Sequence, residues 1–454
     1  MENAEIQLNG RRVALAGSDP AESLLRWLNR QRLTGTKEGC ADGDCGACTV
    51  ALVDTSGAMP RYRAINSCLL PIGVLPGREI VTVEALADGD TLHPVQQAMV
   101  DTAGSQCGYC TPGFVMSMFA GFCHGELGDD TIDGNLCRCT GYVPIRNAMA
   151  QLEPVAANDR FVAALNAERA TLATTSLDRY HNPTTIAAAL TLKARHPDAA
   201  WIAGGTDLGV ELSHGRDTER GFIALDRIAE LRRIERSAGH VRIGAGVPLT
   251  IVEHELRGEF PLLDDMLPWF AARQVRNRAT FGGNLGTASP IGDLAPVLLA
   301  LDATVELEGP RGARTVAIES YFTAYRKTQR ADDEIIVAVT IPRRADLVQG
   351  SLKVAKRQTD DISIVAASFA LARDANGRIV HARLAYGGVA AVPLRAIKCE
   401  NLLLGQALTP DVIEAARAAL EGEFEPLSDH RSGADYRRRL AGNLFAKFVA
   451  ERCA

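Results

Sequence analysis

The cysteines near the start of the chain are spaced as metal ligands are. Of the eleven cysteines in 454 residues, nine come before residue 140. Interleaved glycines in the first set, as at Gly43 and Gly46, allow positive φ and a close approach of the backbone to sulfur. The spacing C-x4-C-x2-C with a distant fourth cysteine is typical of plant-type [2Fe–2S] ligands, and a structural zinc site is the alternative. The first set consists of Cys40, Cys45, Cys48 and Cys68.

A second set combines a CxxC pair with a CxC pair, with 26 residues between the pairs: Cys107, Cys110, Cys137 and Cys139. The spacing alone leaves iron–sulfur and zinc open, and its place directly after the first set favours a second cluster. Both pairs precede expected helix starts, at Thr111-Pro112 with a hydroxyl cap and near Gly141–Ile145. A helix N-terminus stabilises the negative charge of a thiolate-ligated group. Cys123 beside His124 is expected to be a buried helix cysteine, and Cys399 and Cys453 are expected to be structural.

Two glycine-rich turns, at 203–207 and 280–284, could aim backbone N–H groups at phosphates. Two tight structural turns are the alternative. A carboxylate at Asp293 could accept from a sugar or adenine donor. The Gly244-x-Gly246 pair lacks a third glycine in register, and Pro248 interrupts the helix start, so no dinucleotide fingerprint is expected there.

The elements that must position these residues follow from periodicity. Residues 5–15 predict a hairpin turning at Asn9-Gly10, and 20–32 predict a helix that buries Leu24, Leu25, Trp27 and Leu28. Strands are expected at 49–54 and 79–83, helices between 93 and 152, and a linker at 153–180. The region 181–345 mixes short helices and strands, and strands at 351–356, 363–373 and 379–387 precede a helical tail.

Composition limits the class of protein. Apolar content is 46%, charged content 23%, and the net charge of −6 is spread along the chain, which argues against a nucleic-acid groove. No apolar run is long enough to suggest a membrane helix, and the N-terminus shows no apolar signal-peptide core. Crowded cysteines, odd in total, argue against a disulfide framework. We therefore expect a cytoplasmic protein that binds neither membrane nor nucleic acid.

The motifs in combination resemble the molybdenum hydroxylase family, which includes xanthine dehydrogenase and aldehyde oxidase. The cluster motifs are KEGCADGDCGACTV, QCGYCTPGF and GNLCRCTGY, and the flavin motifs are AGGTDLG (203–209), TFGGNLGTASPIGDLAP (280–296), YRKT (325–328) and YGGVAAVPLRA (386–396). Together they span nearly the whole chain. The resemblance implies an α+β multidomain fold: a β-grasp plant-type ferredoxin domain (1–86), a four-helix [2Fe–2S] domain (87–155), a linker (156–180), a two-part α+β FAD-binding domain of the vanillyl-alcohol-oxidase kind (181–345) and a C-terminal α/β sandwich (346–454).

The resemblance also implies flavin contacts. Phe270 matches an aromatic residue beside the flavin, although an ordinary core phenylalanine is the alternative, and Lys353 matches a lysine beside the isoalloxazine, where a surface lysine would be the default. Asp360 and Asp361 match a loop near the flavin and the NAD site, against a solvated acidic loop. The implied FAD contacts are Trp201, Ile202, Ala203, Gly204, Gly205, Thr206, Asp207, Leu208, Phe270, Thr280, Phe281, Gly282, Gly283, Asn284, Asp293, Ile336, Lys353 and Asp360.

The sequence ends after the flavin part, so the chain resembles the small subunit of a bacterial xanthine dehydrogenase. A molybdopterin-binding large subunit is the implied partner, in a dimer of heterodimers, and no catalytic residue is expected on this chain. Electrons from hypoxanthine or xanthine would pass through two [2Fe–2S] clusters to FAD and then to NAD⁺. The alternatives are the equivalent subunit of a hydroxylase for aldehydes or other N-heterocycles, and a zinc-stapled binding protein without redox function.

Overall fold

The computed structural model describes residues 4–57, 59–156, 158–357 and 359–453. The chain forms two compact units. Unit 1 contains Met1–Ala229 and Ala272–Ala279, and unit 2 contains Glu230–Ala271 and Thr280–Ala454. Among the described helices, none has the length and apolar character that crossing a membrane requires.

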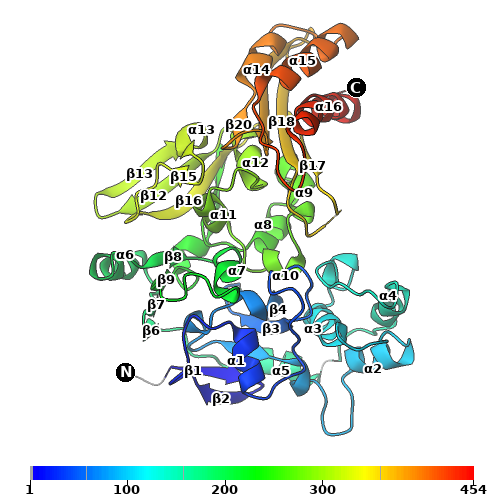
Figure 1. Ribbon diagram of the computed structural model, residues 1–454, viewed down its shortest axis with the longest axis vertical. Helices are drawn as coiled ribbons and strands as arrows, with labels where there is room; N and C mark the ends of the chain where they lie inside the picture. The colour runs from blue at the N-terminus through cyan, green and yellow to red at the C-terminus, as the bar shows by residue number, and fades with distance from the viewer. Residues whose placement is uncertain (1–3, 58, 157, 358, 454) are drawn as a thin grey trace. The chain divides into compact units, whose positions relative to one another are not determined.

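Unit 1 begins with a mixed sheet in the order β2-β1-β5-β3-β4, drawn in blue in Figure 1. The hairpin predicted at Asn9-Gly10 is confirmed, because β1 and β2 pair antiparallel on either side of it. Ser23 caps the N-terminus of α1, whose predicted apolar face, including Trp27, is fully buried. The strand β4 was not predicted. The elements are β1 (Glu5–Leu8), β2 (Arg11–Ala14), α1 (Leu24–Arg30), β3 (Thr49–Asp54), β4 (Arg61–Asn66), the short 3-10 helix η1 (Ser67–Leu69) and β5 (Glu79–Val81).

A helical part follows, coloured from light blue through cyan to blue-green in Figure 1. It consists of α2 (Pro94–Asp101), α3 (Thr111–Phe122), α4 (Val143–Ala150) and α5 (Arg160–Leu165). Helix α5 lies inside the segment predicted as a linker. That prediction was wrong at these residues, because Phe161 and Leu165 are buried in the same apolar core as Phe119 and Phe122. Sequence periodicity missed α5 because only two positions of this short helix are buried.

A partly buried histidine beside this core makes the stability depend on pH. His124 Nε2 accepts a hydrogen bond from the backbone N–H of Tyr62, at 3.0 Å, which requires a neutral ring. Burial, assisted by Arg61, lowers the pKa of His124 from 6.5 to about 4, although Glu126 opposes the shift. The unfolded chain therefore takes up this proton first as the pH falls below about 6.5, and stability is lost between that pH and about 4.

We expect His124→Gln to flatten this pH dependence, because the glutamine Oε1 can accept the Tyr62 N–H without titrating. The urea midpoint should fall less between pH 7 and pH 5 in the variant than in the unchanged chain. The exposed His254 provides a control, since His254→Gln should leave the fall unchanged. Equal pH dependence in all three proteins would contradict the assignment.

Unit 1 ends in a second sheet, in the order β6-β7-β9-β8. Strands β7 and β8 each pair parallel with β9. The segment Ala272–Ala279 belongs to this unit, although its neighbours in sequence belong to unit 2. The elements are β6 (Thr175–Leu177), β7 (Tyr180–Asn182), α6 (Ile186–Arg195), β8 (Ala200–Ile202), α7 (Leu208–Ser213), β9 (Phe222–Ala224) and α10 (Arg273–Arg276).

Unit 2 contains a sheet in the order β10-β11-β16-β12-β13, whose paired strands are antiparallel. Strand β11 runs through Gly244 into the turn before α8. The amides of Gly244 and Gly246 donate to the carbonyls of Arg233 and Leu231, so both amides are bonded to the backbone segment that precedes β10. The elements are β10 (Ile234–Arg236), β11 (His240–Gly244), α8 (Leu249–Glu255), α9 (Pro261–Met266), α11 (Phe281–Thr287), α12 (Leu294–Ala300), β12 (Thr304–Gly309), β13 (Gly312–Ala317), α13 (Ile318–Tyr321), β14 (Phe322–Ala324), β15 (Lys327–Thr328) and β16 (Ile335–Pro342).

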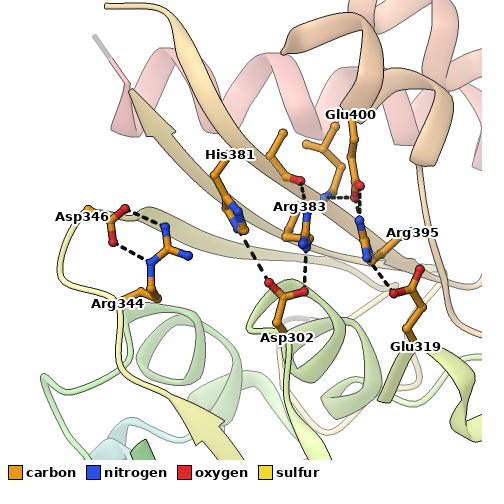
Figure 2. A network of polar contacts seen from close by, with 10 residues as sticks. Asp302, Glu319, Arg344, Asp346, His381, Arg383, Arg395 and Glu400 are labelled. Atoms are coloured by element: carbon orange, nitrogen blue, oxygen red, sulfur yellow. Dashed lines mark hydrogen bonds and ion pairs between the residues drawn. The ribbon is translucent and has the colours of Figure 1, made fainter. Parts of the chain in front are cut away.

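The C-terminal part of unit 2 is a sheet in the order β17-β18-β19-β20 covered by helices. Its strands confirm the three predicted from the sequence. A polar network fastens this sheet to the preceding elements (Figure 2): Arg383 Nε donates to Asp302 at 2.6 Å, and Arg395 pairs with Glu319 at 3.1 Å. The elements are β17 (Val348–Val354), β18 (Val365–Arg373), β19 (Ile379–Gly387), β20 (Leu394–Arg395), α14 (Ile397–Leu403), α15 (Pro410–Glu423) and α16 (Ala434–Arg452).

Candidate functional site

The first cysteine set gathers around the loop between α1 and β3. Cys40, Cys45 and Cys48 come from this loop, and Cys68 comes from η1. The sulfurs of Cys48 and Cys68 are buried and 3.3 Å apart. Cys40 and Cys45 are half-buried, and Cys40 Sγ accepts the backbone N–H of Cys45 at 3.3 Å. The loop thus brings together the four cysteines predicted from their spacing as two sulfur pairs.

This loop suits a thiolate-ligated group. A hydrogen bond from Cys45 lowers the pKa of Cys40 to about 5 against the effect of burial, and the same contact raises the pKa of Cys45. The pair therefore favours one thiolate, which is the form that binds metals. Gly43 and Gly46 have φ of +89° and +64°, which glycine adopts without strain. Within the described residues, no three cysteine, histidine or acidic side chains already converge on one metal position. Four cysteine sulfurs are the kind of donor set that a [2Fe–2S] cluster takes, so the residues present fit such a group by their chemistry.

The second cysteine set lies at the surface of the helical part. Cys107 and Cys139 are exposed and Cys110 and Cys137 half-buried. Cys110 occupies the N-cap of α3, which puts its sulfur at the positive end of the helix. Thr111 was predicted to be the cap, but it is the first helical residue and its hydroxyl donates to Ser105 at 2.8 Å. Cys137 Sγ accepts the backbone N–H of Thr140 at 3.5 Å.

The loops that carry the two sets touch each other. The backbone N–H of Leu136, next to Cys137, donates to the carbonyl of Cys45 at 3.0 Å. Gly113, in the first turn of α3, is so close to the first loop that a Cβ there would meet the Gly46 carbonyl oxygen at 2.2 Å. Side chains larger than hydrogen at this contact would force the two cysteine sets apart.

The turn Ala203–Asp207 in unit 1 links β8 to α7. Arg278 contacts this turn in two ways. Its guanidinium Nε donates to the Gly204 carbonyl at 3.1 Å, and its backbone lies so close that a Cβ on Gly204 would meet the Arg278 carbonyl oxygen at 1.9 Å. Gly209 in α7 packs on η1, where a Cβ would meet the Leu69 carbonyl oxygen at 2.0 Å. The predicted flavin residues of this unit therefore lie beside the loop that carries Cys68. They are Trp201, Ile202, Ala203, Gly204, Gly205, Thr206, Asp207 and Leu208.

The second glycine-rich turn lies in unit 2 at the start of α11. Thr280 caps this helix and accepts the Gly283 N–H at 3.0 Å. The Gly282 N–H donates to Ala245, and the Asn284 N–H donates to the Thr280 carbonyl. These three amides were predicted to face phosphate, but each already has a partner in the protein. Gly282 is required because a Cβ there would meet the Ala245 carbonyl oxygen at 2.8 Å.

Asp293 and Lys353 form a buried ion pair in unit 2. Lys353 Nζ lies 2.8 Å from Asp293 Oδ2, with side chains 5% and 9% exposed, and it also donates to the Trp269 carbonyl at 2.9 Å. Ser363 Oγ donates to the other Asp293 oxygen at 2.5 Å. Lys353 is thus not the surface lysine that would be its default. The Asp293 carboxylate, predicted to accept from a sugar or adenine, is already engaged at both oxygens.

The remaining predicted flavin residues are spread over unit 2. Phe270 ends the 3-10 turn η6 (Leu267–Trp269) and is only partly buried, so it is not an ordinary core phenylalanine. Ile336 lies buried in β16. Asp360 is buried with φ of +52°, which separates it from a solvated acidic loop, whereas Asp361 accepts the backbone N–H groups of nearby loop residues.

Sequence reasoning missed the polar residues of Ala272–Ala279. Gln274 and Arg276 are each 1% exposed, and Asn277 donates to the Ala64 carbonyl at 2.8 Å. A run of arginine, glutamine and asparagine has no apolar period, so nothing in the pattern signalled burial. Cys123, Cys399 and Cys453 are buried, as predicted for structural cysteines.

Comparison with known families divides the chain into four matched segments. Residues 6–72 match a 2Fe-2S iron-sulfur cluster binding domain and residues 82–150 a [2Fe-2S] binding domain. Residues 173–344 match the FAD binding domain in molybdopterin dehydrogenase. Residues 350–452 match the CO dehydrogenase flavoprotein C-terminal domain.

Whole-chain relatives agree with these matches. The chain is 30% identical to xanthine dehydrogenase of Emericella nidulans and to xanthine dehydrogenase/oxidase of Rattus norvegicus, over 97% of this chain and 38% of each relative. It thus spans less than two fifths of the length of these relatives. Among solved structures, carbon monoxide dehydrogenase from Hydrogenophaga pseudoflava is similar with 30% identity and a TM-score of 0.58, over 60% of this chain and 96% of that one. Quinoline 2-oxidoreductase from Pseudomonas putida 86 is 27% identical with a TM-score of 0.57, over 62% and 98%.

Proposed function

This chain belongs to the molybdenum hydroxylase family as an iron–sulfur and FAD electron-transfer module, and from that premise we propose that it passes electrons from hypoxanthine or xanthine to NAD⁺. The purine would be oxidised at a molybdenum centre on a molybdopterin-binding partner subunit, in a dimer of heterodimers. The eight cysteines of the two sets would hold the clusters. When bound, the clusters carry single electrons and FAD converts them into two-electron chemistry.

One observation carries the proposal: the loop with Cys68 packs directly on the helix that starts at the predicted flavin turn. Gly209 of α7 contacts the backbone of Leu69, and Val210 packs with Cys48 and Cys68. Direct packing between a set of cluster ligands and a cofactor-binding turn suits electron transfer. The turn residues of unit 1 would orient FAD, and Arg278 would hold that turn in place.

The second cysteine set would face the partner. Around the exposed Cys107 and Cys139, several apolar side chains are also exposed: Tyr109 by 51%, Leu136 by 42% and Val143 by 64%. Apolar groups beside exposed ligands suit a surface that a protein covers. This supports entry of electrons at this set and their exit from the flavin.

In unit 2, the amides of Gly282, Gly283 and Asn284 serve the fold, so the turn at Thr280 would contribute shape rather than those donors. Lys353, held by Asp293, would present its charge beside the isoalloxazine, and Phe270 would pack against the ring. The loop that contains Asp360 and Asp361 would lie on the NAD⁺ side. Ile362 is 45% exposed there and offers an apolar contact for a nicotinamide.

The ligand assignment is tested by replacing one exposed cysteine. In the complex, Cys139→Ala should lose about half of an expected total of about four irons per chain and keep its FAD, since each [2Fe–2S] cluster needs its cysteine ligands. Cys123→Ala, in the same helical part, is the matched control and should keep all the iron. Full iron content in Cys139→Ala, or zinc in place of iron in the unchanged chain, would overturn the proposal.

Substrate and acceptor are tested with the chain co-expressed with its molybdopterin-binding partner. Xanthine should reduce the flavin anaerobically, and added NAD⁺ should be converted to NADH. Reduction by an aldehyde or another N-heterocycle but not by xanthine would assign the chain to a sister hydroxylase. Reoxidation by O₂ but not by NAD⁺ would change the acceptor.

A further inference from the structure

The segment Ala272–Ala279 belongs to unit 1 although its neighbours in sequence belong to unit 2, and it buries polar side chains. Gln274, on α10, is 1% exposed within unit 1. Its flanks are fixed by ion pairs, because Arg273 pairs with Asp130 and Arg276 lies 3.2 Å from Asp133. The segment is therefore docked on the loop that precedes Cys137.

The Gln274 carboxamide joins three pieces of chain. Its Nε2 donates to Asn135 Oδ1 and to Ser117 Oγ, each at 3.0 Å, and lies 3.5 Å from Thr49 Oγ1. Asn135 belongs to the loop before Cys137, Ser117 to the helix capped by Cys110, and Thr49 follows Cys48 directly. A single side chain thus contacts the supports of both cysteine sets.

The partners of Gln274 continue the connection. Asn135 Nδ2 donates to the Gly46 carbonyl at 3.0 Å, and Thr49 Oγ1 donates to the same carbonyl at 2.6 Å. The next residue, Leu136, donates to Cys45. An apolar side chain would fill the same volume, but it could not donate to the acceptors on Asn135 and Ser117 as the Gln274 Nε2 does.

We propose that Gln274 is a positioning residue for electron transfer between the two cluster sites. It holds the Cys45–Thr49 loop against the Asn135–Cys137 loop and so sets the distance and orientation between the two groups of ligands. The inference rests on the proposed function, because it takes the two cysteine sets to be cluster ligands. It places a residue from the flavin part of the sequence in control of the contact between the clusters.

The test compares Gln274→Met with the unchanged chain in the purified complex. Methionine keeps the length of the side chain and removes its hydrogen bonds. Both proteins should contain about four irons. In the variant, the magnetic splitting between the two reduced clusters should change in the paramagnetic resonance spectrum, and the rate of flavin reduction after substrate should fall about tenfold, in the range typical of groups outside the ligand shell. Gln97→Met, at an exposed position on α2, should match the unchanged chain.

Each outcome decides. Unchanged splitting and rate in an iron-replete Gln274→Met protein would overturn the inference. If that variant fails to retain iron, Ser117→Ala decides instead, because it removes only one hydroxyl of the network: altered splitting supports the inference and unaltered splitting overturns it. If the unchanged chain shows no signals from two clusters, it is the proposed function that fails.

Discussion

Replacing Gly209 by alanine should cost the chain both stability and flavin. The new Cβ would lie 2.0 Å from the Leu69 carbonyl oxygen. Because the backbone fixes the positions of both atoms, no side-chain rotation relieves the contact. Overpacking of this kind typically costs about 1–3 kcal/mol. The helix α7 would have to move away from η1, which changes the turn at Gly204 and Gly205. We expect a lower urea midpoint and substoichiometric FAD in the purified protein.

The control for Gly209→Ala is another helical glycine with free space. A Cβ on Gly422, in α15, would meet nothing within 4 Å. Alanine is a better helix former than glycine by about 0.5–1 kcal/mol, so Gly422→Ala should hold or raise stability. Propensity favours alanine at both positions, and only the contact with Leu69 separates them. Equal FAD content and equal urea midpoints in the two variants would contradict the packing argument.

The sequence predicted best where a residue's chemistry depends on its neighbours along the chain. The cysteine spacing, the Asn9-Gly10 hairpin and the apolar face of α1 are local patterns. The structure contains the hairpin and the buried helix face, and it brings the cysteines of each set near one another. The strand β4 and helix α5 were missed because burial there comes from distant partners. Phe161, for example, packs against Tyr62 and Phe119, which are distant from it in the sequence.

The two glycine-rich turns that were predicted to bind flavin show the limit more sharply. Glycines at 204 and 282 suggested backbone donors for phosphate, but both are required by close backbone approach, to Arg278 and to Ala245. Glycine marks a place where something comes near, and sequence does not say whether it is a ligand or the chain itself. The role of Gln274 was invisible for a similar reason, since its partners come from three separate segments.

Removing one member of the Asp293–Lys353 pair should produce the largest loss of stability. With Asp293→Ala, the Lys353 ammonium loses its carboxylate and keeps, among the described residues, its hydrogen bond to the Trp269 carbonyl, while it remains buried. Breaking a buried ion pair from one side typically costs about 3–5 kcal/mol. Lys353→Met should cost less, because Ser363 still donates to the Asp293 carboxylate. Urea unfolding of the FAD-free chain measures both.

A surface pair supplies the comparison for this expectation. Lys447 and Glu451 lie 3.7 Å apart on α16 with side chains about half exposed, at 55% and 51%. Exposed pairs of this kind contribute about 0.3–0.5 kcal/mol, so Glu451→Ala should shift the unfolding curve only slightly. A loss as large as that of Asp293→Ala would mean that the measurement reports something other than ion-pair burial.

The double variant Asp293→Ala with Lys353→Met separates the fold from the flavin. Removing both charges leaves no uncompensated ion, so the double variant should be more stable than Asp293→Ala alone. If Lys353 also faces the flavin, however, FAD affinity should stay low in the double variant even as stability returns. Recovery of both together would assign the pair to the fold alone. Recovery of stability without flavin binding would mean that Asp293 holds Lys353 in place for the cofactor. Burial of the ion pair would then lower the stability of the fold and serve flavin binding.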